Sequence, residues 1–182
     1  MISTIIYLIG KILTFPGAYL KGFFEHLCAR VFSIPVESNN YLRLTDGCGH
    51  VEHDTINGKA KNFFYCLLPG LITSIIGAPM LYAGFSGLFL FKIPFDTSTS
   101  LMFVVYLILF YLGFSLCANV YPLMEDALVL WHSIYGKGGA NVFVKIILFV
   151  PVVNIVIGSF LEKYSLNILF MAISTALLAL VF

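Results

Sequence analysis

The sequence predicts an all-α integral membrane bundle with about five to six transmembrane segments and a small β-hairpin between the first and second spans. Three observations lead to this fold class. Hydrophobic residues make up 60% of the 182-residue chain, charged residues make up 10%, and the mean hydropathy is +0.98, which is outside the range of soluble proteins. Two long runs carry no charge, and one polar stretch, residues 34–61, separates the apolar segments. We therefore expect a single membrane domain over residues 1–182.

The first span, residues 1–33, is predicted to consist of two helical pieces. Pro16-Gly17 interrupts this apolar stretch, and proline removes a backbone donor and clashes with the preceding turn of a helix. We expect the pieces at Ile2–Phe15 and Gly17–Phe32. A broken helix is tolerated at membrane depth only where it is buried in protein or lines a polar cavity. The second piece should therefore face the interior of the bundle.

Residues 34–61 are predicted to form a hairpin loop at the membrane surface. Tyr41 to Leu44 alternates in polarity, Asp46-Gly47 is a turn signal, and His50 to His53 alternates again. This pattern is typical of two short strands joined by a turn.

The remaining spans are predicted within residues 62–182. Uncharged runs cover Asn62–Phe91 and Thr97–Met124, and each is long enough to cross a bilayer. Beyond a glycine-containing loop, Ile146–Leu161 and Tyr164–Phe182 give two shorter spans. Asn119 lies in an apolar segment, so we expect it to form a hydrogen bond between helices.

The distribution of lysine and arginine predicts the orientation. If residues 1–33 cross the membrane once, the hairpin loop and the loop after Met124 lie on the same side. Cytoplasmic loops carry an excess of positive charge, which places the hairpin loop in the cytoplasm and the N-terminus outside. Five basic residues then lie on the hairpin side (Arg43, Lys59, Lys61, Lys137, Lys145) and two on the opposite side (Lys92, Lys163). The net charge of +1 argues against a nucleic-acid partner.

Charged residues inside the first span indicate a candidate site. Lys21, Glu25 and His26 fall at positions i, i+4 and i+5, so they share one side of a helix. Ionisable side chains at membrane depth are costly, and by default they mark a functional site.

Three segments carry a resemblance to a known family. They are FPGAYLKGFFEHLCARVFSIPV from Phe15, GHVEHD from Gly49, and YLGFSLCANVYPLMEDALVLW up to Trp131. In this order they resemble the first catalytic helix, the intervening hairpin and the third helix of site-2 protease-like intramembrane zinc metallopeptidases. In a bacterial and archaeal branch of that family, Phe-Pro-Gly and three further residues precede His-Glu-x-x-His. The resemblance implies the core fold of that family and a location in a bacterial or archaeal plasma membrane.

The residues that carry the chemistry of that family are replaced here. Aligned on Phe15-Pro16-Gly17, the first metal-binding His, the general-base Glu and the second His fall on Lys21, Gly22 and Glu25. Only Asp126, the carboxylate of the third helix, matches. Peptide hydrolysis by a zinc enzyme of this family needs two neutral imidazoles to hold the metal and a neighbouring base to take a proton from the bound water. The resemblance therefore implies a pseudoprotease without a cofactor, in which the Lys21 ammonium occupies the region of the cation and pairs with Glu25 and Asp126.

An alternative reading keeps a metal. In this reading the chain is a divergent intramembrane zinc metallopeptidase whose ligands come from the His and carboxylate side chains near the replaced motif, because these are suitable zinc ligands. The candidate ligands are Glu25, His26, His50, His53 and Asp126. Glu125 and Asp126 also fit the first turn of a following helix, where acidic residues favour the positive end of the helix dipole.

The expected function is non-catalytic binding of a partner membrane protein or an extended peptide. Membrane lipids are expected to surround the apolar spans. Active members of the resembled family hold a substrate segment as an added strand near the hairpin, and strand addition provides affinity without catalysis. A third possibility is a structural subunit of a larger membrane complex.

Overall fold

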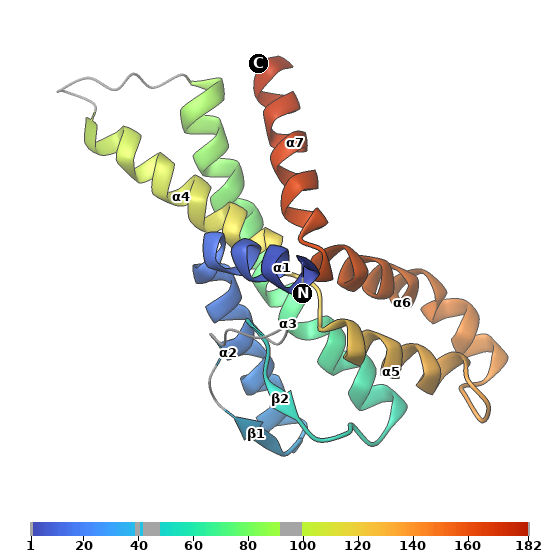
Figure 1. The fold of residues 1–182 in the computed structure, drawn as a ribbon. Helices are drawn as coiled ribbons and strands as arrows, with labels where there is room; N and C mark the ends of the chain where they lie inside the picture. The colour runs from blue at the N-terminus through green and yellow to red at the C-terminus, as the bar shows by residue number, and fades with distance from the viewer. Residues whose placement is uncertain (1, 39–40, 42–47, 92–99, 182) are drawn as a thin grey trace.

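The computed structural model describes residues 2–38, 41, 48–91 and 100–181. The described part of the chain is mostly helical, with one two-stranded antiparallel sheet (Figure 1). Its elements are α1 (Ile2–Leu13), α2 (Phe15–Val31), β1 (Val36–Ser38), β2 (Glu52–His53), α3 (Lys59–Phe85), η1 (Ser86–Leu90), α4 (Ser100–Ala118), α5 (Met124–Tyr135), α6 (Val142–Lys163) and α7 (Leu166–Val181).

Three helices in the described residues are long and apolar enough to cross a membrane. They are Lys59–Leu90, which joins α3 to the π-helical turn η1, together with α4 and α6. The helices α1 and α7 are apolar but shorter. Large apolar side chains on the spans face outward; Ile75, Leu101 and Val150 are 70%, 78% and 74% exposed. Exposed apolar surface of this kind is suited to contact with lipid, and the chain has the features of a membrane protein.

The predicted break in the first span is confirmed, and it lies at Thr14, between α1 and α2. Pro16 falls in the first turn of α2, where its missing N–H costs nothing because that group would have no helical partner. Gly17 lies against α4: its backbone N–H donates to Ser115 Oγ over 2.8 Å, and a Cβ at this position would overlap the Ser115 carbonyl. The break is therefore held in the protein interior.

The small sheet is present, but its first described strand is not where the sequence pattern placed it. β1 pairs with β2, with Val36 opposite His53. Of the predicted strand Tyr41–Leu44 and turn Asp46-Gly47, only Tyr41 lies within the described residues.

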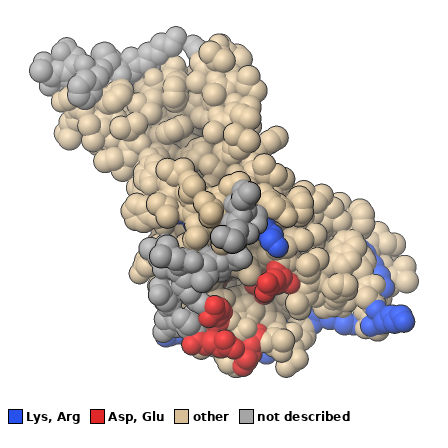
Figure 2. Space-filling view, in the orientation of Figure 1, with Lys and Arg blue, Asp and Glu red and all other residues tan. Residues whose placement is uncertain are grey.

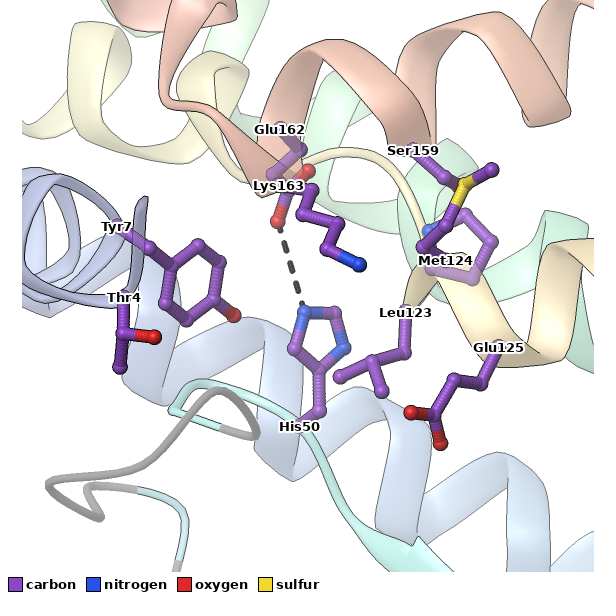
Figure 3. Close-up of a pocket in the computed structure, with 10 residues that line it drawn as sticks. Thr4, Tyr7, His50, Leu123, Met124, Glu125, Ser159, Glu162 and Lys163 are labelled. Atoms are coloured by element: carbon purple, nitrogen blue, oxygen red, sulfur yellow. Dashed lines mark ion pairs between the residues drawn. The ribbon is translucent and has the colours of Figure 1, made fainter. Parts of the chain in front are cut away.

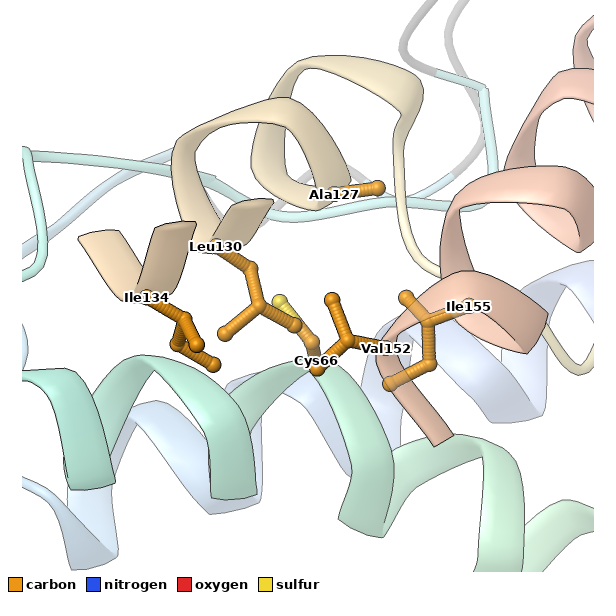
Figure 4. Close-up of a cluster of buried hydrophobic side chains, with 6 residues drawn as sticks. All are labelled: Cys66, Ala127, Leu130, Ile134, Val152 and Ile155. Atoms are coloured by element: carbon orange, nitrogen blue, oxygen red, sulfur yellow. The ribbon is translucent and has the colours of Figure 1, made fainter. Parts of the chain in front are cut away.

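The helices α3 and α4 pack closely because glycines remove side chains from their crossing. A Cβ on Gly84 would overlap the Phe110 backbone, and a Cβ on Gly113 would overlap the Leu81 backbone. At the other end of α3, a compact apolar cluster joins α3, α5 and α6 (Figure 4). The cluster consists of Cys66, Ala127, Leu130, Ile134, Val152 and Ile155.

Helix boundaries differ slightly from the sequence expectation. Helix α3 begins at Lys59 rather than Asn62, and α6 begins at Val142 rather than Ile146. The predicted span to Met124 ends at Ala118, and Met124 starts the separate helix α5. The intervening segment contains Pro122, which cannot continue the hydrogen-bond pattern of α4.

Candidate functional site

A buried cluster of charges lies where α1, α2 and α6 meet, and Lys21 is at its centre. Lys21 projects from α2, is 1% exposed, and places its Nζ 3.6 Å from Glu25 Oε1 and 3.5 Å from Glu162 Oε1. The expected pairing with Glu25, one turn along the helix, is present. The second carboxylate is Glu162 from the end of α6, not Asp126 as the sequence suggested.

A second ammonium enters the cluster from α1. Lys11 Nζ lies 2.5 Å from Glu162 Oε1 and donates to Asn119 Oδ1 over 2.7 Å. The Asn119 amide in turn donates to Thr14 Oγ1 over 2.9 Å, which confirms its predicted interhelical role. The other oxygen of Glu162 accepts the backbone N–H of Tyr121 over 3.0 Å.

Glu25 connects the cluster to the segment that leads into the hairpin. His50 Nδ1 lies 2.9 Å from Glu25 Oε1, and the Val51 backbone N–H donates to Glu25 Oε2 over 3.1 Å. On its other side, His50 Nε2 lies 3.6 Å from Glu162 Oε1. This geometry fixes the loop before β2 against both carboxylates.

The two ammonium groups and two carboxylates balance in charge, and all are less than 5% exposed. Buried charges are tolerated only when they are paired and hydrogen-bonded. Here both oxygens of each carboxylate have a partner, as described above. The cluster is therefore a self-contained ion network that joins parts of the chain as distant as α1 and α6.

A cavity of about 90 Å³ adjoins the cluster (Figure 3). His50 and Glu162 lie on its wall, with Tyr7, Ser159 and Lys163 around them. The Ser159 hydroxyl is buried and has no hydrogen-bond partner in the described part of the chain. The cavity has both polar and apolar walls, the latter including Leu123 and Met124, and it is large enough for a few water molecules or one small side chain.

Asp126 belongs to a separate pair. Its Oδ1 lies 3.5 Å from His53 Nε2 in β2, and its backbone carbonyl lies 3.8 Å from Cys66 Sγ. The His53 ring packs edge-on against Tyr65, with 4.6 Å between ring centroids. Asp126 is in the first turn of α5, as the alternative reading of Glu125 and Asp126 predicted. This pair fastens the hairpin to α5.

Gly22, which stands where the resembled family has its general base, is covered by Tyr41. A Cβ on Gly22 would lie 2.9 Å from Tyr41 Cβ and Cγ. The Tyr41 hydroxyl lies 2.8 Å from His26 Nδ1, and Arg30 Nε donates to His26 Nε2 over 2.9 Å. His26 is thus engaged on both ring nitrogens, by Arg30 and by Tyr41.

The candidate zinc ligands fall into three separate environments. Glu25 is with His50, Asp126 is with His53, and His26 is with Arg30 and Tyr41. In the described ranges, no three or more His, Cys, Asp or Glu side chains gather in a geometry that could hold a metal ion.

The His53–Asp126 pair predicts a pH dependence of stability. Burial acts to lower the pKa of His53, but the hydrogen bond and charge of Asp126, with further contributions from Asp54 and Glu25, raise it to about 9. An unfolded histidine titrates near pH 6.5. A raised folded-state pKa adds stability that is complete below about pH 6.5 and is lost as the pH rises through about 9.

Because His53 is only partly buried, solvent screening reduces this contribution to about 1 kcal/mol. We therefore expect the melting temperature in detergent to fall by about 2–4 °C over this pH interval. In Asp126→Asn the fall should be much smaller, because the charge that raises the pKa of His53 is absent. His132→Gln is the matched control, since His132 is exposed at the other end of α5 and its loss should leave the profile unchanged. Equal profiles for wild type and Asp126→Asn would contradict the assignment.

Two members of the cluster, Lys11 and Glu162, were not among the sequence candidates. Both stand next to long apolar runs, and that isolation is the signal that could have identified them.

The fold and the site together define a class: a helical membrane protein with a buried, charge-balanced ion network beneath a small β-hairpin. Searches against family models, curated proteins and solved structures found no match to this chain.

Proposed function

We propose that this is a non-catalytic membrane protein with a site-2 protease-like core that binds an extended segment of a partner membrane protein beside its hairpin. One observation carries the proposal. The Lys21 ammonium lies between the carboxylates of Glu25 and Glu162, in the helix that resembles the zinc-binding helix of active enzymes.

The ion network supports a binding role over a catalytic one. A zinc ion needs ligand atoms with free lone pairs and an open position for water. Here Glu25 accepts from His50 and Val51, and Glu162 accepts from Lys11 and Tyr121. A cation at this position would have to displace two ammonium groups. The ring of Tyr41 also covers Gly22, so the position of the general base is filled by another side chain.

The hairpin supports the binding half of the proposal. Within the described residues, β1 and β2 pair only with each other, and an extended segment can add to the outer edge of such a sheet through main-chain hydrogen bonds. His50 and Val51 tie the approach to β2 to Glu25, and His53 ties β2 to Asp126. A sheet held rigidly in this way is preorganised, which lowers the entropic cost of binding.

The surface over the hairpin indicates the charge of the partner. Glu37, Glu52 and Asp54 are exposed on or next to the strands, and Glu125 is exposed on α5. On the face shown in Figure 2, acidic side chains gather over the hairpin and the start of α5, while the upper part, built from α3, α4 and α7, shows no charged side chain outside the grey atoms. A partner segment rich in lysine or arginine would complement this surface.

The proposal includes the location and orientation expected from the sequence: a bacterial or archaeal plasma membrane, with the hairpin in the cytoplasm. In this orientation the exposed lysines Lys59, Lys61 and Lys137, at the start of α3 and in the loop after α5, would lie on the cytoplasmic side.

Site-specific photocrosslinking in the native membrane tests the binding role. A photoreactive amino acid at position 37 or 52 is expected to give a discrete adduct with one membrane protein, and Asp54→Lys should lower its yield by reducing the charge complementarity. The matched control places the same group at exposed position 137, which lies in the loop after α5. Adducts from positions 37 and 52 that resemble those from 137 would argue against a binding site at the hairpin.

The alternative, a divergent zinc metallopeptidase, has one observation in its favour. The hairpin brings two His–carboxylate pairs, His50–Glu25 and His53–Asp126, into the same region, and the carboxylates of both pairs raise the pKa of His53. Elemental mass spectrometry on the detergent-purified protein separates the two functions. Stoichiometric zinc that is lost in Asp126→Ala would support the enzyme. A purely structural subunit would instead co-purify with its complex without any adduct from the hairpin.

A further inference from the structure

A chain of polar side chains at the C-terminal end of α2 has no role in the ion network. Arg30 Nε donates to His26 Nε2 over 2.9 Å, and His26 Nδ1 lies 2.8 Å from the Tyr41 hydroxyl. His26 is 9% exposed, whereas Arg30 is exposed. Within the described residues, no carboxylate forms an ion pair with Arg30. Its positive charge is therefore not balanced by a neighbouring side chain in this part of the chain.

The hydrogen bonds among Arg30, His26 and Tyr41 determine which atom carries each proton. A guanidinium group only donates, so His26 Nε2 is the acceptor. A neutral imidazole that accepts at Nε2 carries its proton at Nδ1 and donates it to the Tyr41 oxygen. The hydroxyl hydrogen of Tyr41 is then left to donate outward. Among the described residues, only Nε of Arg30 donates a hydrogen bond, to His26. Its terminal N–H groups and the Tyr41 hydroxyl together form a site for a hydrogen-bond acceptor with negative charge.

The site opens on a groove with an apolar wall. Phe23, Leu27, His26, Arg30 and Tyr41 line a cavity of about 240 Å³. The wall continues along the outward face of α2 at four-residue spacing, where the exposed side chains are Tyr19, Phe23, Leu27 and Val31. A ligand that fills this groove therefore has an anionic end and a long apolar part.

Neighbouring cations place the polar end at the level of lipid headgroups. Lys61, at the start of α3, donates to the Phe32 carbonyl over 3.3 Å, two residues beyond Arg30. Lys59, in the same turn of α3, instead donates to the Gly138 carbonyl in the loop after α5 over 2.9 Å. Basic side chains at the ends of apolar helices lie at the membrane surface, where they attract anionic lipids.

We propose that this groove binds one anionic phospholipid, with its phosphate accepting hydrogen bonds from Arg30 and Tyr41 and an acyl chain lying along Phe23 and Leu27. Arginine is suited to this role because its planar fork binds phosphate oxygens in a bidentate manner. Gly22 supports the site, since the absence of a side chain lets Tyr41 pack against α2 and hold its hydroxyl beside His26.

Native mass spectrometry of the detergent-purified full chain tests the proposal, with phosphatidylglycerol, phosphatidylcholine and inorganic phosphate as probes. We expect one saturable phosphatidylglycerol site, weaker phosphatidylcholine binding, and no competition by inorganic phosphate. Arg30→Gln should weaken phosphatidylglycerol binding about tenfold, which corresponds to about one charge-assisted hydrogen bond. Lys137→Gln removes an exposed cation of the loop after α5 that does not line the groove, and it should leave the affinity unchanged.

Two further variants keep the test decisive if Arg30→Gln folds poorly. Tyr41→Phe removes only the donor hydroxyl and should lower the affinity several-fold, while Arg30→Lys keeps the charge without the fork and should bind with intermediate affinity. Equal effects of Arg30→Gln and Lys137→Gln, unchanged binding in Tyr41→Phe, or equal binding of the two lipids would overturn the proposal. Displacement of the lipid by inorganic phosphate would assign the site to free phosphate instead.

Discussion

Glu162→Gln is expected to lower the free energy of unfolding by about 3–5 kcal/mol, the usual effect of removing one partner from a buried ion network. The substitution keeps the shape of the side chain but removes the negative charge that faces Lys11 at 2.5 Å and Lys21 at 3.5 Å. Of the carboxylates in the described part of the chain that contact this network, Glu25 alone would then be left for two buried ammonium groups. Thermal unfolding in detergent measures the loss.

A second substitution separates lost pairing from lost packing. Lys11→Met combined with Glu162→Gln removes one charge of each sign and leaves Lys21 paired with Glu25, so part of the stability should return. Glu125→Gln is the matched control, because Glu125 is exposed and exposed pairs contribute little. A double variant that is no more stable than Glu162→Gln alone would show that the network does not act through charge balance.

Gly113→Ala is expected to destabilise the bundle by about 2–3 kcal/mol, near the upper part of the range for overpacked positions. The added Cβ would meet the backbone of Leu81 in α3, which cannot move aside as a flexible side chain can. The α3–α4 crossing would have to open, and the reciprocal contact of Gly84 with the Phe110 backbone would open with it.

The control for this prediction lies on the same helix. Leu107 in α4 is 48% exposed, so Leu107→Ala changes more atoms but removes little protein packing. Its melting temperature in detergent should stay close to that of wild type. A loss in Leu107→Ala as large as the loss in Gly113→Ala would mean that helix stability in general, and not close approach at glycine, sets the effect.

Local features of the sequence predicted much of the helical organisation. Pro16-Gly17 predicted the break in the first span, because proline cannot continue the hydrogen-bond pattern of a preceding helix and is favoured in the first turn of the next one. Asn119 predicted an interhelical hydrogen bond, since an amide in an apolar helix needs a partner. The acidic pair at Glu125 and Asp126 predicted a helix start, because the dipole of the helix favours negative charge in the first turn.

The pairing of the sheet was less accessible from the sequence. The strand at Val36–Ser38 lacks a clear alternation of its own, and it is defined by its contact with Glu52–His53. Register in such short strands depends on what covers them. Here the position of β2 is set by two contacts, from the Val51 backbone N–H to Glu25 and from His53 to Asp126.

The sequence by itself determined that Lys21 and Glu25 share a helix face and must be compensated, because a charge in an apolar segment is too costly to remain unpaired. It did not determine the remaining partners. Glu162 lies 141 residues from Lys21, and Lys11 reaches the same carboxylate from a separate helix. Only the tertiary structure decided these contacts, since the crossing of α1, α2 and α6 selects which of several available carboxylates comes within range of each ammonium.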